Sequence, residues 1–218
     1  MSSSCTLVFR HSALQNSADY GGAIYNEMSD LMIMNAICSK NSAQIGGGMY
    51  NLVGYPTIIN ATFAGNSADL CGALYNGAGA TLINIIASGD TASSLRNEIM
   101  SHDSTVVSYS LIEGCGGSGV GWDSLMGTDG GNNIDADPMF VDLEAGDLHI
   151  WSSSPAIDAG NSTVIPLNVF TDLDGNSRMY GGDIDLGAYE YQGVPTGLSN
   201  ESHIVVNVPI LVSKRISS

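Results

Sequence analysis

The chain has 218 residues, of which 44% are hydrophobic, so it is long and apolar enough to bury a core. Charged residues make up only 13%, and 22 acidic against 6 basic residues leave a net charge of -16. This charge repels phosphate backbones, which makes nucleic acid and anionic membranes poor partners, and no apolar run is long enough for a transmembrane helix.

One motif of eleven residues dominates the first half of the chain. It occurs at residues 16–26, 41–51 and 66–76, so that each copy starts 25 positions after the last. Apolar stretches such as LMIMNAICS and PTIINATFA lie between the copies, and TLINIIASG marks a degenerate fourth coil. Helical periodicity is absent and helical repeats are longer, about 33 to 34 residues. The pattern predicts an all-β solenoid, a right-handed parallel β-helix with coils of ~25 residues.

Three regions follow from this pattern. We expect β-helix coils over 1–113, the final coils and an irregular C-terminal cap over 114–192, and a linker or tail over 193–218. HIVVNVPILV in the tail has two interpretations, an isolated strand or the start of a sorting domain. Because a solenoid edge exposes unpaired backbone groups, edge-to-edge self-association is expected to be a risk.

Stacking the coils places equivalent asparagines in columns, where amide side chains bond along the stack and tolerate the backbone of a corner. The three predicted columns are Asn16, Asn41 and Asn66; Asn26, Asn51 and Asn76; and Asn35, Asn60 and Asn84.

An aliphatic column marks the inward face of the GGAIY-type strands. It consists of Ile24, Met49 and Leu74. Small residues two positions earlier allow the chain to turn tightly over the core, and these are Gly22, Gly47 and Gly72. By alternation Tyr25, Tyr50 and Tyr75 face outward and form a tyrosine ladder.

The four cysteines are Cys5, Cys38, Cys71 and Cys115, and no pair has the CxxC spacing of a zinc or redox site. We expect them to fill the core as small apolar side chains. A disulfide in an oxidising compartment stays open as the alternative.

The motifs GGAIY and CGALY, together with FAGN at Phe63 to Asn66, resemble the repeats of polymorphic outer-membrane proteins. The segments NIDADPMFVD, GDLHIWSSSPAIDAG and TDLDGNSRMYGGDIDLGAYEYQ resemble the C-terminal part of bacterial choice-of-anchor Q proteins, which are right-handed β-helices of the pectin-lyase-like superfamily. The resemblance implies a secreted or cell-surface protein, although the N-terminus lacks the pattern of a signal peptide. It implies little about activity, because the superfamily holds both enzymes and adhesins.

An acidic column is the first candidate site. Asp19 and Asp69 occupy equivalent positions two coils apart, with Gln44 between them. Two ladder steps separate their backbones by about 9 to 10 Å, near the upper end of the roughly 6.5 to 9.5 Å between the carboxyl groups of inverting glycosidases. The alternative is a pair of corner aspartates that accept hydrogen bonds from the backbone.

DLDGNSRMYGGD offers a candidate calcium loop. Asp172, Asp174, Asn176 and Asp183 fall at spacings that loosely match an EF-hand. Ser177 stands where that loop needs glycine, and Asp183 stands where it needs glutamate. An Asx-rich turn in the C-terminal cap is the alternative.

The tyrosine ladder, with Tyr20 and Tyr55 nearby, is the candidate ligand-binding site, because aromatic faces stack on sugar rings. A lyase needs a basic residue, but no two of the basic residues share a column in the clear repeats. The four histidines lack the spacing of a metal site or a catalytic triad. We therefore expect an exported, non-catalytic adhesin, glycan-binding module or spacer. The alternative is a polysaccharide lyase or glycoside hydrolase that uses Asp19 and Asp69.

Overall fold

The computed structural model describes residues 12–94, 98–101, 104–166, 169–193 and 210–213. Its main body is a parallel β-solenoid of about five turns, as the repeat predicted. Strands of successive coils pair in register at a spacing of 25 residues, so that Ile24 pairs with Met49 and Met49 with Leu74. The right-handed winding stays a prediction.

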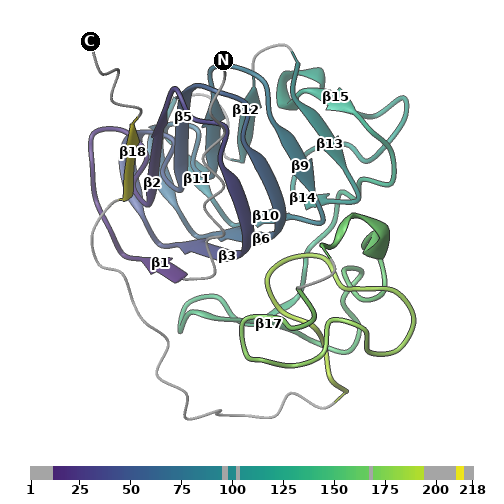
Figure 1. Ribbon diagram of the computed structural model, residues 1–218. Coiled ribbons are helices and arrows are strands. Elements are labelled where there is room, and N and C mark those ends of the chain that lie inside the picture. Colours follow the sequence, from purple (N-terminus) through teal and green to yellow (C-terminus); the bar gives the residue numbers. More distant parts are fainter. Residues whose placement is uncertain (1–11, 95–97, 102–103, 167–168, 194–209, 214–218) are drawn as a thin grey trace.

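Three parallel sheets make up the solenoid (Figure 1). The long sheet contains β1 (Ser12–Leu14), β3 (Met32–Ser39), β6 (Thr57–Ala64), β9 (Thr81–Ile83), β10 (Ile86–Ser88), β13 (Val106–Ser108), β14 (Leu111–Ile112) and β15 (Thr128–Asp129). The short sheet contains β4 (Ser42–Ile45), β7 (Ser67–Leu70) and β11 (Thr91–Ala92). The tyrosine sheet contains β18 (Ile210–Ser213), β2 (Ile24–Glu27), β5 (Met49–Val53), β8 (Leu74–Asn76) and β12 (Ile99–Ser101).

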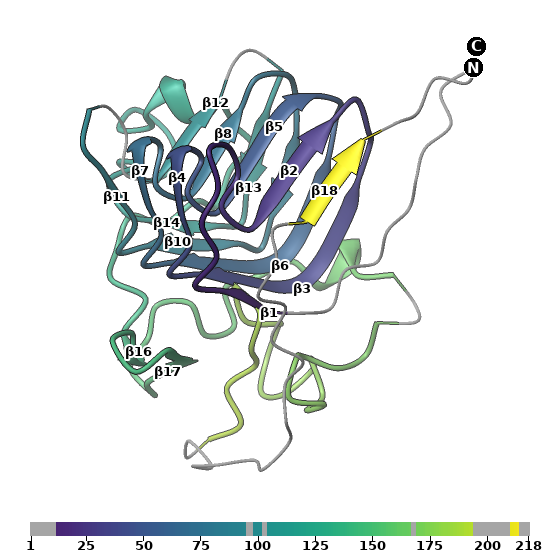
Figure 2. The same cartoon turned by 90° about the vertical axis from the view of Figure 1, so that its left-hand side faces the viewer.

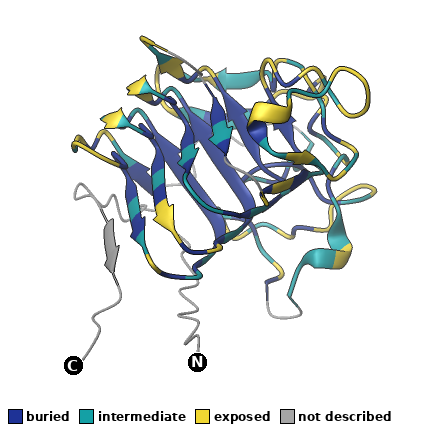
Figure 3. Ribbon diagram, turned by 90° about the horizontal axis from the view of Figure 1, so that it is seen from above, coloured by how far each residue is buried: buried dark blue, intermediate teal, exposed yellow. Residues whose placement is uncertain are grey.

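The predicted columns are present in the structure. Ile24, Met49 and Leu74 are at most 2% exposed and belong to the central core, so the inward face is confirmed. Figure 3 shows that the strands are largely buried and that exposed residues gather at the turns. Cys38, Cys71 and Cys115 are buried, as expected of apolar fillers, whereas Cys5 lies outside the described residues.

Amide ladders run along all three asparagine columns. In the first column Asn16 Nδ2 donates to Asn41 Oδ1 at 3.0 Å, and Asn41 Nδ2 donates to Asn66 Oδ1 at 2.9 Å. The corner backbone is confirmed for Asn35 and Asn60, whose φ angles are 48° and 52°. The other two columns are buried without a positive φ, so hydrogen bonding along the stack is what selects asparagine there.

Gly47 shows why the motif needs a glycine at this position. A Cβ atom on Gly47 would lie 2.5 Å from the carbonyl oxygens of both Gly72 and Ser67, which belong to the next coil. Backbone atoms cannot move aside as a flexible side chain can. The absence of a side chain therefore allows successive coils to stack at this turn.

Gly47→Ala is expected to lower the free energy of unfolding by about 1–3 kcal/mol, since the added methyl group overpacks the stack. Urea unfolding followed by circular dichroism measures the change. Ser67→Ala on the exposed face of β7 is the matched control, with an expected change within about 0.5 kcal/mol. Equal midpoints for the two variants would contradict the steric explanation.

The C-terminal half of the chain has two parts. Residues 114–131, with η1 (Ser124–Met126), cover the end of the core through Cys115, Met126 and the partly buried Trp122. Residues 135–166 and 169–192, called the side lobe below, pack along the outer face of the long sheet (Figures 1 and 2). The lobe contains the antiparallel pair β16 (Phe140–Asp142) and β17 (Asp147–Ile150), and η2 (Ser162–Val164). The region over which we expected final coils and an irregular cap, 114–192, thus contains an end cap and a side lobe, and the predicted domain bounds stay a prediction.

Apolar contacts hold the lobe to the solenoid. Met34 and Ile59 on the outer face of the long sheet pack with Val169, while Ile37 and Ala64 pack with Ala188. Because inward-facing neighbours of these strands are buried as well, both faces of the long sheet are covered. This double burial explains the nearly continuous apolar runs in β3 and β6.

Candidate functional site

Three tyrosines stack along the tyrosine sheet. Their ring centroids lie 5.5 Å apart for Tyr25 and Tyr50, and 5.2 Å apart for Tyr50 and Tyr75, with interplanar angles of 4° and 8°. The side chains stand on the face opposite the buried Ile24 column and are partly exposed, as alternation predicted. The solenoid thus presents a regular aromatic row across β2, β5 and β8.

The stacking changes the chemistry expected of this row. Ring faces turned toward each other are covered by their neighbours, so Tyr50 between its two partners cannot offer a face to a sugar. Ring edges and hydroxyl groups remain for a ligand. Burial raises the pKa of Tyr50, and its neighbouring tyrosines add to the shift. The pKa of Tyr25 is raised by burial and then by Glu27, so both phenols stay protonated donors at neutral pH.

The two outlying tyrosines behave differently. Tyr20 lies beside the row, 5.2 Å from Tyr50 with its ring tilted by 50°, and is 45% exposed. Tyr55 is 64% exposed and lies over the backbone of Gly79, where a Cβ atom would be 2.7 Å from the ring. Tyr20 therefore packs beside the ladder, while Tyr55 provides a separate exposed ring.

The acidic column lies on the short sheet. Gln44 Nε2 donates to Asp19 Oδ1 at 3.0 Å, and Asp69 Oδ1 accepts from Ser93 Oγ at 3.2 Å. Asp19 and Asp69 are exposed and occupy equivalent positions two coils apart, which confirms the predicted column. A shallow depression of about 410 Å³ beside Asp69 is lined mainly by small side chains of the same sheet. Their catalytic role stays a prediction.

Three residues of the candidate calcium loop form one turn, and the fourth bonds to a different segment. Asp172 Oδ1 accepts from the backbone N–H groups of Asp174 and Asn176 at 2.9 and 2.8 Å, which is the geometry of an Asx-rich turn. Asp183 Oδ1 accepts from the Ser162 N–H at 3.1 Å. In the described ranges no group of three or more His, Cys, Asp or Glu side chains is placed to hold a metal ion. These contacts add no support for calcium.

The structure brings together a histidine and two carboxylates that the sequence patterns did not connect. His149 Nδ1 lies 2.6 Å from Asp147 Oδ1, its Nε2 lies 2.6 Å from Asp174 Oδ2, and its ring stacks on Tyr189 at 4.1 Å. Burial opposes protonation, but the two carboxylates outweigh it and raise the pKa of His149 to about 9. At neutral pH the imidazolium therefore ties β17 to the turn at Asp172 through two charged hydrogen bonds.

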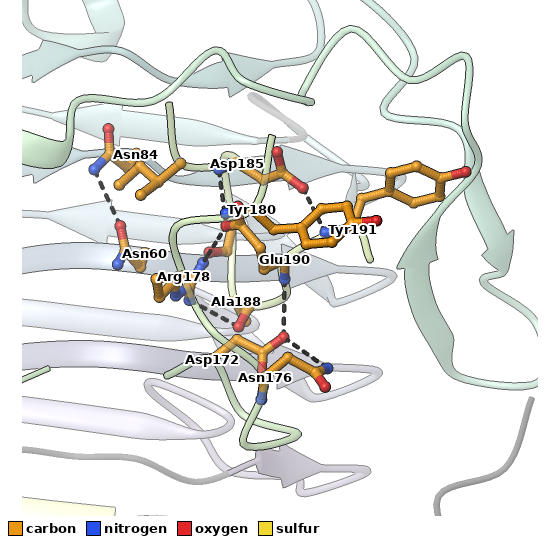
Figure 4. Close-up of polar contacts among 12 residues, drawn as sticks. Asn60, Asn84, Asp172, Asn176, Arg178, Tyr180, Asp185, Ala188, Glu190 and Tyr191 are labelled. Carbon is orange, nitrogen blue, oxygen red and sulfur yellow. Dashed lines mark hydrogen bonds and ion pairs between the residues drawn. The ribbon is translucent and has the colours of Figure 1, made fainter. Parts of the chain in front are cut away.

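A polar cluster fastens the side lobe to the solenoid (Figure 4). Arg178 is 1% exposed and donates to Asn35 Oδ1 at 2.7 Å, and to the carbonyl oxygens of Gly187 and Ala188 at 3.0 and 2.8 Å. Glu190 Oε2 lies 4.0 Å from Arg178 Nη1. Burial raises the pKa of Glu190 to about 8, although the guanidinium group opposes that shift.

A second buried pair lies inside the solenoid. Asp90 is 2% and Glu98 4% exposed, and Glu98 Oε1 accepts from the Asp90 N–H at 3.2 Å. Asp90 Oδ1 also ends the first asparagine ladder by accepting from Asn66 Nδ2 at 2.7 Å. Extending the 25-residue spacing would have found Glu98, because Ile99 pairs with Leu74 and Glu98 therefore takes the inward column of Ala73.

No protein-family model, curated protein or solved structure matches the chain. The structure supports the coarse part of the sequence resemblance, a parallel β-solenoid with coils of about 25 residues. Among the described residues, no helix is long and apolar enough to cross a membrane.

Proposed function

We propose that the protein is an exported, non-catalytic β-solenoid module that binds an extended neutral polysaccharide along the tyrosine ladder. One observation carries this proposal: Tyr25, Tyr50 and Tyr75 form a straight, partly exposed row that crosses three coils at a regular spacing. A polymer that runs along the solenoid axis would meet the same phenol group at every coil. Its hydroxyl groups would exchange hydrogen bonds with the protonated phenols.

The charge of the chain favours a neutral ligand. The net charge is -16, and Glu27 lies two residues after Tyr25 in the same strand. A uronate polymer would be repelled by this surface. The relation to choice-of-anchor Q proteins belongs to this proposal, as does display at a bacterial cell surface. The low content of charged residues suits a module exposed to varying salt, because few of its contacts depend on screening.

The tyrosine hydroxyl groups provide the test. In the triple variant Tyr25→Phe, Tyr50→Phe and Tyr75→Phe the stacked rings are kept but the hydroxyl groups are lost. We expect retention on neutral polysaccharide gels to fall about tenfold or more while the melting temperature changes little, since each lost hydrogen bond contributes about 1 kcal/mol. Affinity electrophoresis on dextran, β-glucan and galactomannan, with polygalacturonate as the acidic comparison, measures the change.

A Tyr55→Phe variant is the matched control, because Tyr55 is exposed but not stacked in the ladder. Unchanged retention in the triple variant, or no retention of the wild type on any gel, would leave the protein as a spacer. Release of reducing ends or unsaturated products that disappears in Asp69→Asn would contradict the non-catalytic proposal and favour the enzyme alternative with Asp19 and Asp69.

A further inference from the structure

A cavity lies where the end cap meets the tyrosine sheet. β12 is at one end of this sheet, next to β8, and η1 of the end cap contacts it. Residues from β12 and from the cap line a cavity of about 350 Å³. This volume is at the lower end of the range of about 300 to 1,000 Å³ that small-ligand pockets show, so the cavity suits one compact molecule.

Hydroxyl groups make up much of the lining. They belong to Ser101, Ser104, Ser124 and Thr128. Each hydroxyl can donate one hydrogen bond and accept two, so together they match a ligand that itself carries several donors and acceptors.

Ser101 is the buried member of this set. It is 9% exposed, and its Oγ has no hydrogen-bond partner in the described part of the chain. The strand register places Ser101 beside Asn76, but Asn76 Nδ2 donates to Thr105 Oγ1 at 2.6 Å and to the Ala78 carbonyl oxygen at 2.7 Å. The asparagine ladder therefore bypasses Ser101. A buried hydroxyl without a partner is costly, and a ligand in the cavity could supply that partner.

Trp122 gives the cavity a rigid apolar wall. Its Nε1 donates to the Gly127 carbonyl oxygen at 2.8 Å, and its side chain packs against the central core while it also lines the cavity. The indole is therefore held in place before any ligand arrives. An aromatic wall with a few polar groups is the usual lining of a small-molecule site.

Asp129 is the charged residue among the described residues of the lining, and none of them is basic. Its Oδ1 accepts from the Gly131 N–H at 2.8 Å and from Asn133 Nδ2 at 2.9 Å, and its Oδ2 accepts from the Gly119 N–H at 2.7 Å. Burial opposes ionisation, but these hydrogen bonds outweigh it and lower the pKa of Asp129. The carboxylate is thus ionised at neutral pH and repels an anionic ligand.

We propose that this cavity is a second binding site that takes one neutral sugar residue, either free or at the end of a chain. The Trp122 ring packs against the C–H face of the sugar, and Ser101 and Thr128 exchange hydrogen bonds with its hydroxyl groups. This site goes beyond the tyrosine ladder, because Ser101 lies in the inward column of Asn76 whereas Tyr75 faces outward.

Tryptophan fluorescence tests the site on the full chain. The chain has two tryptophans, so a Trp151→Phe background makes the signal report on Trp122. The probes are glucose, galactose, mannose and N-acetylglucosamine, with glucuronate as the acidic comparison. We expect a saturable change with at least one neutral sugar and weaker binding of glucuronate. No saturable change with any neutral sugar, or equal binding of glucuronate and glucose, would overturn the proposal.

Two substitutions in this background separate sugar binding from a structural role. Ser101→Ala is expected to weaken binding about tenfold, the effect of one buried hydrogen bond, while the melting temperature stays the same or rises because no bond within the protein is lost. Thr128→Val keeps the shape of the side chain and is expected to weaken binding as well. Ser152→Ala, an exposed serine in the side lobe, is the matched control. Unchanged affinity in both cavity variants would overturn the proposal and leave a cavity filled by water.

Two further measurements place the sugar. The variant with phenylalanine at positions 25, 50 and 75 should bind the monosaccharide as the wild type does, so this site can fail or succeed independently of the ladder. Loss of monosaccharide binding in that variant would assign the sugar to the ladder and overturn the proposal. Oligomers of the same sugar distinguish its sources: comparable binding of a tetrasaccharide indicates a chain end, and binding of the monosaccharide alone indicates a free sugar.

Discussion

Replacing Arg178 by methionine is expected to detach the side lobe from the solenoid and to cost about 3–5 kcal/mol, since three buried acceptors lose a hydrogen-bond donor and each loss costs about 1–3 kcal/mol. Methionine fills part of the volume but cannot donate to Asn35 or to the two carbonyl oxygens. Glu190, only 2% exposed, would lose its nearest cation, and its pKa would rise further. The lobe should therefore unfold before the solenoid does.

Two spectroscopic signals separate these events. Trp151 lies in the side lobe and Trp122 in the end cap, so a Trp122→Phe background makes tryptophan fluorescence report on the lobe alone. Far-ultraviolet circular dichroism, which reports on β-sheet, follows the solenoid, which holds most of the described strands. Met179→Ala is the matched control, because Met179 is the next residue and is 60% exposed. If the fluorescence midpoint in urea does not move below that of the control, Arg178 does not hold the lobe.

The repeat made the solenoid predictable because its information is local and periodic. A 25-residue spacing fixes the register, and alternation around Ile24, Met49 and Leu74 then separates inward from outward positions. The same periodicity identified Tyr25 and Tyr50 as one outward row. It did not give the direction of their ring planes, which follows from the short distance between adjacent strands.

The side lobe could not be predicted from the periodicity of the sequence. Its contacts join residues far apart in sequence, such as Arg178 with Asn35 and Ala188 with Thr62, and no repeat relates these positions. One signal was present: the runs in β3 and β6 are apolar at inward and outward positions alike, which indicates a sheet covered on both faces. The third asparagine column also contacts the lobe, because Asn35 and Asn84 at its two ends both form hydrogen bonds with lobe residues.

The buried pair Asp90 and Glu98 is expected to change the free energy of unfolding over a wide range of pH. Burial raises the pKa of Asp90 to about 7, with Glu113 adding to the shift while hydrogen bonds oppose it. The pKa of Glu98 rises to about 11 through burial and the adjacent charge of Asp90. Asp90 Oδ2 and Glu98 Oε2 are buried without a hydrogen-bond partner, which also favours the protonated forms.

The direction in which stability changes with pH depends on which state, folded or unfolded, binds more protons. Unfolded Asp and Glu lose their protons near pH 4, whereas the folded pair keeps them up to about pH 7 and about pH 11. The folded state therefore binds more protons than the unfolded state above pH 4. The free energy of unfolding falls as the pH rises through this window, by about 1.4 kcal/mol per pH unit for each extra proton.

Glu98→Gln should remove most of this dependence, because an amide stays neutral at every pH and can still donate to Asp90. We expect the variant and the wild type to unfold at similar urea concentrations at pH 5, and the variant to be increasingly more stable from pH 6 to pH 9. The difference in free energy of unfolding between the two proteins does not contain the contributions of Asp185, Glu190 and His149, because these residues are common to both. Glu144→Gln is the matched control, since Glu144 is an exposed carboxylate that is not among the groups shifting the pKa of Asp90 or Glu98. Parallel curves for wild type and Glu98→Gln would show that the pair is ionised in the folded state at neutral pH, and that other groups set the pH dependence.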